Sequence, residues 1–317
     1  MSKYVKISCM APPLKEVDPG QGFEDVVAQM IAKWEAQLRQ VLPEQPDFIV
    51  LPECCDDPHF KDMSIEWLYD YYRHRGNRIR DYFAGVARAH RCYIAYSANV
   101  EMPDGSFRNA THVLDRAGEV CGTYNKNFIT IRQKSNSDTL YGKEAQVIET
   151  DFGRVACIIC FDINFDELRE QYLRQKPDLI VFSSAYHGGM MTSYWAYTCR
   201  AYFAGSIWRP GICSILNPVG EVVAESTLFY PHVTETVNMD RAVVHYDFNW
   251  EKLEAAKRKY GYKLRISDPT RLNAFVISSE TDEFTIQDII REFDLELLDD
   301  YWARCRADRS IPGHLEA

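Results

Sequence analysis

The stretch 154-RVACIICFDINFDELREQYLRQ-175 decides the fold of this chain. Residues 155–160 form an uninterrupted apolar run, which favours a strand buried on both faces. Residues 167–175 follow it directly and are interpreted as a helix. A buried strand that leads into a helix is the repeating unit of α/β proteins, so the sequence predicts the α/β fold class.

The same alternation of short apolar runs and longer amphipathic segments extends outward in both directions. Further helices are expected at residues 23–41, 76–90, 192–204 and 250–260. Further strands are expected at residues 4–10, 47–51, 92–98, 109–115, 120–123, 147–150, 179–183, 211–216, 221–225, 234–238 and 243–247.

Composition excludes several classes of protein. The chain has 317 residues, 46% of them hydrophobic and 26% charged, and a formal net charge of −10. These values exclude a disordered or fibrous chain, and the acidic balance argues against nucleic-acid binding and against binding to an anionic membrane. No apolar run approaches the ~18 residues of a membrane span. Ten cysteines are too sparse for a disulfide scaffold, and no secretory signal opens the chain. We therefore expect a reduced, cytoplasmic protein.

The composition changes after about residue 268. Residues 285–309 have the spacing of one amphipathic helix, and Thr285 with Asp288 forms a capping-box pattern at its start. We predict a main domain of residues 1–268 and a partly helical C-terminal extension of residues 269–317. The extension is a candidate for packing against a partner subunit.

Three apolar strands end on a reactive side chain. Residues 47–53 end on the carboxylate of Glu53, residues 122–126 on the amine of Lys126, and residues 154–160 on the thiol of Cys160. Sites in open α/β sheets form at the carboxyl ends of strands, and a thiol just before a helix faces the positive end of its dipole. The three residue types suffice for acyl transfer: the thiolate attacks, the carboxylate moves protons, and the amine with the Phe161 backbone N–H stabilises an oxyanion.

The segments FIVLPE (48–53), GTYNKNF (122–128) and GRVACIICFDINFDELR (153–169) resemble, in order, the three signature stretches of the nitrilase (carbon–nitrogen hydrolase) superfamily. SSAYHGG and ILNPVGEVVAES, further along the chain, extend the resemblance. It implies a four-layer α-β-β-α sandwich that assembles into homodimers or higher homo-oligomers. It also implies Glu53 as general base, Lys126 as charge stabiliser and Cys160 as nucleophile, with no metal and no cofactor. The implied partners are water and a small-molecule amide or N-carbamoyl substrate.

The sequence departs from the family pattern in two places. Many members carry a second glutamate before the nucleophile strand, whereas residues 133–142 contain none, and Asp138 is the candidate replacement. After the helix expected at 192–204, residues 206–210 lead quickly to the next strand, which should reshape one wall of the pocket.

Neighbouring residues supply candidate substrate contacts: Cys54 beside Glu53, Tyr186 and His187 in the loop after residues 179–183, and Trp195 on the following helix. Asp162 and Glu167 are interpreted as structural residues that fix the turn and helix after Cys160.

Alternative functions remain open. Cys157 and Cys160 form a C-x-x-C, but on a strand residues three apart point to opposite faces, which argues against a dithiol. A zinc site would need a second pair of ligands, which the sequence does not show beside this C-x-x-C. In a cysteine–histidine enzyme, His187 would be the base for Cys160. Nitrile hydrolysis by the same cysteine, or a catalytically silent relative that binds a ligand or partner, would also fit the three segments.

Overall fold

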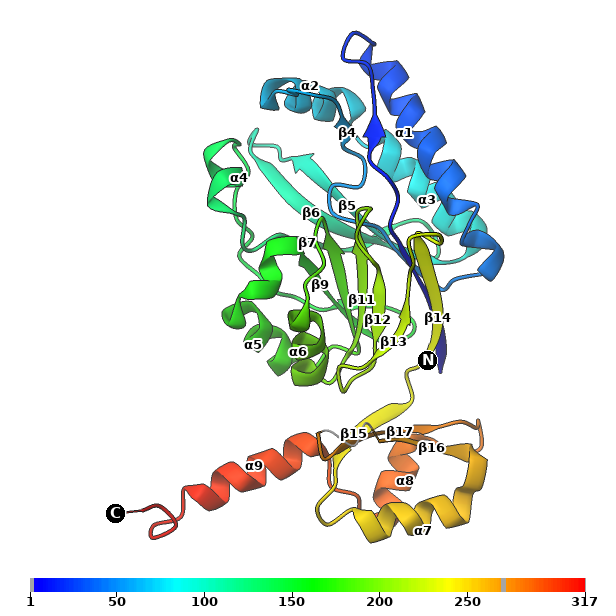
Figure 1. Ribbon diagram of the computed structural model, residues 1–317, viewed down its shortest axis with the longest axis vertical. Coiled ribbons are helices and arrows are strands. Elements are labelled where there is room, and N and C mark those ends of the chain that lie inside the picture. The colour runs from blue at the N-terminus through cyan, green and yellow to red at the C-terminus, as the bar shows by residue number, and fades with distance from the viewer. Residues whose placement is uncertain (1–2, 269–271, 317) are drawn as a thin grey trace. The chain divides into compact units, whose positions relative to one another are not determined.

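The computed structural model describes residues 3–268 and 272–316. It divides the chain into two compact units, Met1–Val237 and Asn238–Ala317 (Figure 1). This division lies earlier in the chain than residue 268. The reason is that the strand and helix that follow Asn238 pair and pack with the later residues, as described below.

The first unit is built on two six-stranded sheets. The first sheet has the order β14 (His232–Asn238), β1 (Tyr4–Met10), β3 (Phe48–Val50), β5 (Tyr93–Glu101), β6 (Phe107–Leu114) and β7 (Val120–Asn125). The second has the order β13 (Val222–Glu225), β12 (Ser214–Leu216), β11 (Tyr202–Ile207), β10 (Leu179–Ser184), β9 (Arg154–Ile159) and β8 (Ile148–Glu149). Strand β3 pairs in parallel with β1 and β5, and β10 pairs in parallel with β9 and β11. The pairs β5–β6, β8–β9 and β11–β12 are antiparallel.

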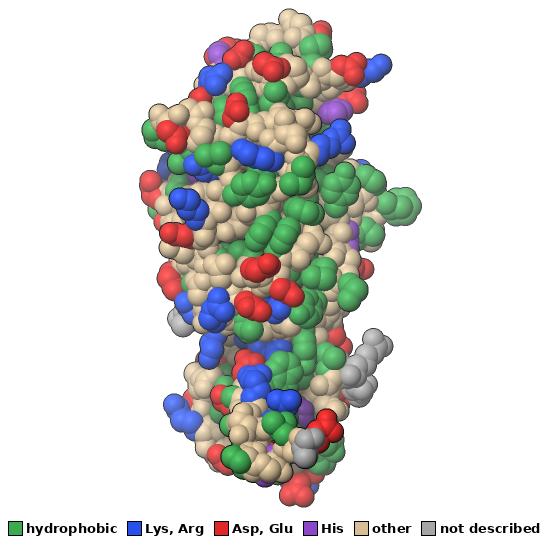
Figure 2. All heavy atoms as spheres, turned by 90° about the vertical axis from the view of Figure 1, so that its left-hand side faces the viewer, with side chains coloured by type: hydrophobic (Ala, Val, Ile, Leu, Met, Phe, Trp, Pro, Cys, Tyr) green, Lys and Arg blue, Asp and Glu red, His purple; other side chains and the backbone are tan. Residues whose placement is uncertain are grey.

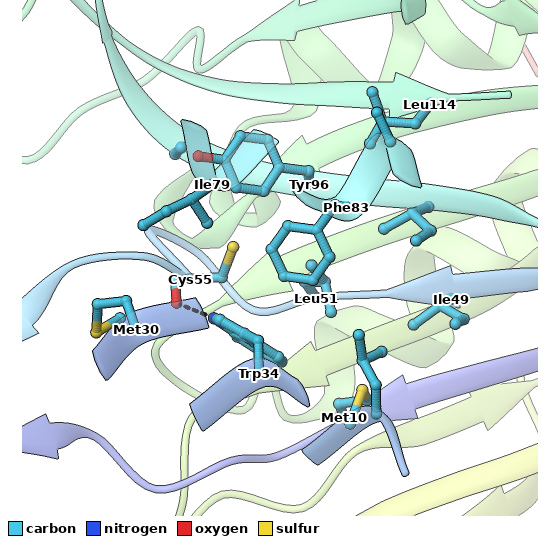
Figure 3. Packing of buried hydrophobic residues seen from close by; sticks show 14 of the residues in the cluster. Met10, Met30, Trp34, Ile49, Leu51, Cys55, Ile79, Phe83, Tyr96 and Leu114 are labelled. Carbon is cyan, nitrogen blue, oxygen red and sulfur yellow. Dashed lines mark hydrogen bonds between the residues drawn. The ribbon is translucent and has the colours of Figure 1, made fainter. Parts of the chain in front are cut away.

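Helices cover the outer face of each sheet (Figure 1). Helices α1 (Phe23–Leu38), α2 (Ile65–Arg75) and α3 (Arg78–His90) share one apolar cluster with strands of the first sheet, part of which Figure 3 shows around Trp34 and Phe83. Helices α5 (Asp166–Gln175) and α6 (Met190–Cys199) lie against the second sheet. Strands β1 and β3 contact β10 and β11 between the sheets. The expected four-layer α-β-β-α sandwich is therefore confirmed.

Short elements complete the first unit. They are β2 (Lys15–Glu16), β4 (Pro58–His59), α4 (Ile131–Ser135) and the 3-10 helices at Leu42–Glu44 and Cys160–Asn164. On the face of this unit shown in Figure 2, acidic, basic and hydrophobic side chains are interspersed, without a continuous basic surface.

Two sequence predictions in this unit are wrong. The helix expected at 192–204 ends at Cys199, because Arg200 adopts a left-handed conformation with φ of +54°, and the apolar run after it forms the central strand β11. Residues 206–210 therefore include the end of a strand and are not simply a connection. Helix α2 was not predicted, since its sequence IEWLYDYYRHR mixes aromatic and charged residues without a clear apolar stripe.

The second unit is a three-stranded antiparallel sheet of order β15 (Arg241–His245), β17 (Ala274–Ser279) and β16 (Leu264–Ser267). Helices α7 (Trp250–Tyr260) and α8 (Ile286–Phe293) enclose its apolar core, and a 3-10 turn at Gly261–Lys263 and helix α9 (Leu298–Arg309) complete it. The predicted capping box of Thr285 and Asp288 is present. The single helix expected over 285–309 is two helices, because Asp294 adopts φ of +50° and ends α8.

No helix within residues 3–268 or 272–316 combines the length and the apolar character that a membrane span requires.

Candidate active site

Glu53 and Lys126 form a buried ion pair at the carboxyl ends of β3 and β7. The Lys126 Nζ lies 2.6 Å from Glu53 Oε1, and the two side chains are only 3% and 11% exposed. Asn109 of β6 donates a second hydrogen bond to the same oxygen, at 2.8 Å. Trp208 donates its ring N–H to the Glu53 backbone carbonyl at 2.6 Å. The carboxylate is thus held by two donors on Oε1, while Trp208 holds the backbone of the same residue, and Oε2 is left for a reacting group.

The amine of Lys126 is kept charged. Burial acts to lower its pKa, but the charge of Glu53, with smaller effects from Cys160, outweighs burial and raises the pKa above the ordinary value for lysine. A permanently charged ammonium beside a carboxylate can stabilise a negative charge that develops next to both.

Cys160 follows β9 directly and begins the 3-10 helix Cys160–Asn164, with φ of +46°. A non-glycine residue in this region is strained, and such strain is typical of functional turns. Burial and the charge of Glu53 raise the pKa of the thiol to about 11, although Lys126, the Ser184 hydroxyl and the Ala185 backbone N–H each lower it. The structure therefore brings Cys160 into the electrostatic reach of the Glu53–Lys126 pair, and at neutral pH its sulfur carries a proton.

Asp162 links the end of β9, which precedes Cys160, to the segment after β7, which contains Lys126. Its carboxylate accepts hydrogen bonds from Ile159 N at 2.9 Å, from the Tyr124 hydroxyl at 2.7 Å and from Phe128 N at 2.7 Å. Burial raises the pKa of Asp162 to about 7, against the lowering effect of these donors. The structural role expected for Asp162 is confirmed in its contacts: one side chain fixes both the turn after β9 and the segment after β7.

The other predicted site residues lie in different surroundings. Cys54 follows Glu53, with φ of +47°, and its sulfur accepts a hydrogen bond from Asn99 at 3.2 Å. Tyr186 is 77% exposed, and His187, also exposed, uses Nδ1 to accept the backbone N–H of Gly189. Phe161 lies within the 3-10 turn immediately after Cys160.

Two of the predicted roles disagree with the structure. Trp195 is fully buried and donates its ring N–H to Ile163 O at 2.8 Å, so it supports the 3-10 turn after β9 from the core and offers no surface to a substrate. Asp138 is exposed and lines a hollow formed by residues 63–69 and 134–138, which includes none of Glu53, Lys126 and Cys160. Asp138 is therefore not placed to act as a second catalytic carboxylate.

The sequence did not predict the contacts that Asn109 and Trp208 make with Glu53, or those that Ser184 and Ala185 make with Cys160. Asn109 gives little signal, because its strand FRNATHVL contains other polar residues as well. Trp208 gives none, because an indole is equally expected in a core.

The dithiol interpretation is not supported. Cys157 is fully buried, its carbonyl accepts the Tyr172 hydroxyl at 2.7 Å, and burial raises the pKa of its thiol. Both Cys157 and Cys160 are free thiols. Within the described ranges, no group of three or more His, Cys, Asp or Glu side chains could hold a metal ion.

Comparison with known proteins identifies the family. The carbon-nitrogen hydrolase family model matches residues 23–242, which is more than half of the chain. The chain therefore belongs to the carbon–nitrogen hydrolase family, and the resemblance to the nitrilase superfamily is confirmed.

Its relatives include the omega-amidase NIT2 of Danio rerio, 21% identical over 224 residues, with 63% of this chain and 79% of the relative covered. The omega-amidase NIT2 of Homo sapiens is 20% identical over 245 residues, with 70% and 83% covered.

Among solved structures, Saccharomyces cerevisiae Nit3, a member of branch 10 of the nitrilase superfamily, superposes with a TM-score of 0.63 at 15% identity, covering 86% of this chain and 98% of that one. A double mutant of the amidase from Nesterenkonia sp. AN1, in complex with acrylamide, gives a TM-score of 0.59 at 13% identity, covering 82% and 98%. These likenesses show the nitrilase fold.

Proposed function

We propose that this protein hydrolyses the amide C–N bond of a small molecule through a thioester on Cys160. The observation that carries the proposal is the buried Glu53–Lys126 pair beside the strained Cys160, in a chain of the carbon–nitrogen hydrolase family. The omega-amidases among its relatives favour an amide over a nitrile as substrate.

The proposed reaction begins with proton transfer. Glu53 takes the thiol proton of Cys160, and the thiolate attacks the carbonyl carbon of the amide. The carbonyl π electrons move to oxygen, where Lys126 and the Phe161 backbone N–H stabilise the negative charge. The intermediate collapses, the C–N bond breaks, and the nitrogen leaves as ammonia or an amine with the proton held by Glu53.

The second half of the reaction releases the acid. Glu53 takes a proton from water, the hydroxide attacks the thioester carbon, and the C–S bond breaks. The sulfur recovers its proton from Glu53, and the carboxylic acid departs. A base is needed in the first stage because the thiol pKa of about 11 keeps Cys160 protonated at neutral pH, and in the second stage because water must lose a proton to attack the thioester.

The test is a screen of amides, N-carbamoyl compounds and nitriles for ammonia release, with mass spectrometry of the trapped protein. We expect amide turnover and an acyl adduct on Cys160, both lost in Cys160→Ala. The matched control is Cys305→Ala, which changes an exposed cysteine of the second unit and should keep full activity. An adduct on another cysteine, or turnover that survives in Cys160→Ala, would overturn the proposal. Turnover of N-carbamoyl compounds or nitriles alone would replace the amide as substrate class.

We also propose a homodimer, as the superfamily resemblance implies. Sedimentation or light scattering should then give twice the chain mass of 36.7 kDa, and a mass of one chain would contradict it.

A further inference from the structure

The residues immediately after Glu53 form a second buried polar group, which the proposed reaction does not use. Asp56 is fully buried and forms an ion pair with Arg75 of α2, and the Tyr96 hydroxyl donates to the same carboxylate. Arg75 also donates to the Asn99 carbonyl at 2.6 Å. The charge of Arg75 is thus matched by Asp56.

Asp57, the next residue, has no such cation. Its Oδ2 accepts the Tyr72 hydroxyl at 3.0 Å and, at a longer 3.4 Å, the amide of Asn99. Its Oδ1 is shut off from solvent and has no hydrogen-bond partner among the described residues. Lys33, the other buried cation nearby, lies over the Trp208 ring at 4.4 Å and forms no ion pair with Asp57. The Oδ1 of Asp56 also has no hydrogen-bond partner among the described residues, but Asp56 forms an ion pair with Arg75 through its other oxygen. A buried carboxylate oxygen without a donor is costly, and at Asp57, which forms no ion pair with any described residue, a cationic ligand would supply both the donor and the charge.

This oxygen belongs to the surroundings of the candidate active site. Asn99 of β5 and Asn109 of β6 are directly opposite each other in the sheet, so their side chains project from the same face. Asn109 donates to Glu53 Oε1, while Asn99 donates to the Cys54 sulfur and to the Tyr72 hydroxyl at 2.9 Å. Both Cys54 and Asp57 are partly exposed to solvent. Asp57 is therefore separated from Glu53 by the two neighbouring side chains of Asn99 and Asn109.

We propose that Asp57, with Tyr72 and Asn99, forms a subsite beside Glu53 that binds a primary ammonium group of the substrate. This inference rests on the proposed function and narrows its substrate class to amides that carry a second, positively charged amine. An ammonium group would donate to Oδ1 and neutralise the buried charge, whereas a substrate carboxylate at this place would meet Asp57 with like charge. The product would be an amino acid with its amine distant from the new carboxylate.

The test compares ω-amino amides of increasing chain length with alkyl amides and ω-carboxy amides of the same length. For the wild-type enzyme, we expect kcat/KM for the best ω-amino amide to exceed that of its alkyl counterpart by about 10- to 100-fold, the range typical of a charged hydrogen bond. In Asp57→Asn this ratio should fall to about 1, because the asparagine side chain has the shape of aspartate but carries no charge. A structural defect would lower both substrates alike and leave the ratio unchanged. Asp25→Asn, which removes an exposed carboxylate of α1, is the matched control.

The pH dependence of the same ratio provides a second readout that needs no variant. The titratable and charged groups around Asp57 are Asp56, Arg75, Tyr72, Cys54, Glu53 and Lys33, and burial with the charge of Asp56 raises the pKa of Asp57 to about 7. The ratio of ω-amino to alkyl turnover should therefore rise as pH increases through about 7, while the titration of Cys160, common to both substrates, cancels.

The two proposals fail in different ways. If alkyl or ω-carboxy amides are turned over through a Cys160 adduct as well as ω-amino amides are, the subsite is wrong and the amidase proposal stands. If no amide of any charge forms an adduct on Cys160, the proposed function itself is wrong.

Discussion

The sulfur of Cys160 illustrates how burial and charge act on one residue. Desolvation and the charge of Glu53 raise the pKa of the thiol, while Lys126, Ser184 and Ala185 lower it, and the result is a pKa of about 11. A nucleophile with so high a pKa is unreactive until a base removes its proton. The resting enzyme therefore holds a thiol rather than a thiolate.

This state predicts the pH dependence of alkylation. The rate of Cys160 modification by iodoacetamide should keep rising with pH beyond 9 and level off only near 11, because only the thiolate reacts. Peptide mass spectrometry separates Cys160 from the exposed Cys121 and Cys305. A plateau below pH 8 would show a preformed thiolate and contradict the general-base role proposed for Glu53.

Asp57 predicts an effect on stability. Its folded pKa of about 7 lies above the ordinary value of 3.8, so the folded state binds the proton more tightly, and the resulting stability is lost as pH rises from about 4 through 7. Between pH 4 and pH 7 the unfolding free energy of Asp57→Asn should therefore rise relative to that of the wild type, by up to about 1.4 kcal/mol for each unit by which the folded pKa exceeds the unfolded one. Above pH 7 the difference in unfolding free energy should stay constant. Urea unfolding at pH 5 and pH 8 measures the difference. A variant that is less stable than wild type at pH 8 would show that the charge is compensated in the folded state.

At the scale of elements, the site depends on how strands end. Strands β7 and β9 belong to different sheets, and Asp162 joins the segments that follow them through backbone N–H groups on both sides. The position of Cys160 relative to Lys126 is thus set by hydrogen bonds between strand ends as well as by the packing of the sheets.

Asp162→Asn should disturb this junction. Donors contact both carboxylate oxygens, so an amide must present its own N–H₂ to one of them, leaving a buried donor unsatisfied at a cost of about 1–3 kcal/mol. We expect a lower unfolding free energy and a loss in kcat larger than the change in KM, measured by urea titration and steady-state kinetics. Glu170→Gln, at an exposed carboxylate of α5, is the control. An unchanged kcat in a destabilised Asp162→Asn would restrict Asp162 to folding.

Across the whole molecule, the apolar residues form separate cores in the two units. The cluster around Leu253, Phe275, Ile277 and Ile289 draws its members only from residues beyond Asn238. The antiparallel pairing of β15 and β16 with β17 explains why β15, although expected within the main domain, belongs to the second unit.

Separate cores predict a local response to a cavity. Ile277→Ala removes a fully buried side chain of β17 and should destabilise the second unit by about 2–5 kcal/mol. Hydrogen exchange should accelerate in residues 238–316 and stay unchanged in β9, β10 and β11. Ile180→Ala in β10 should give the opposite pattern. Faster exchange throughout the chain in Ile277→Ala would show that the two units unfold as one.

The sequence alone determined the fold class and the strand ends of Glu53 and Cys160, because buried parallel strands are continuous apolar runs and a reactive residue at the end of the run stands out. The four layers and the role of Lys126 came from the resemblance to the nitrilase superfamily, since the strand before Lys126 is antiparallel and largely exposed. Periodicity could not separate α6 from β11, since a short apolar segment satisfies either structure until its neighbours are known.

Only the tertiary structure decided which polar residues meet. Asn109 holds Glu53, Asp162 joins two strand ends and Asp57 keeps an oxygen without a donor, while Asp138 and Trp195 lie away from the roles their sequence neighbourhoods suggested. The physical reason is that hydrogen bonds and buried charges depend on distances across sheets, between residues far apart in the chain. The amino-acid sequence determines which polar groups are present, and the tertiary structure determines which of them form pairs.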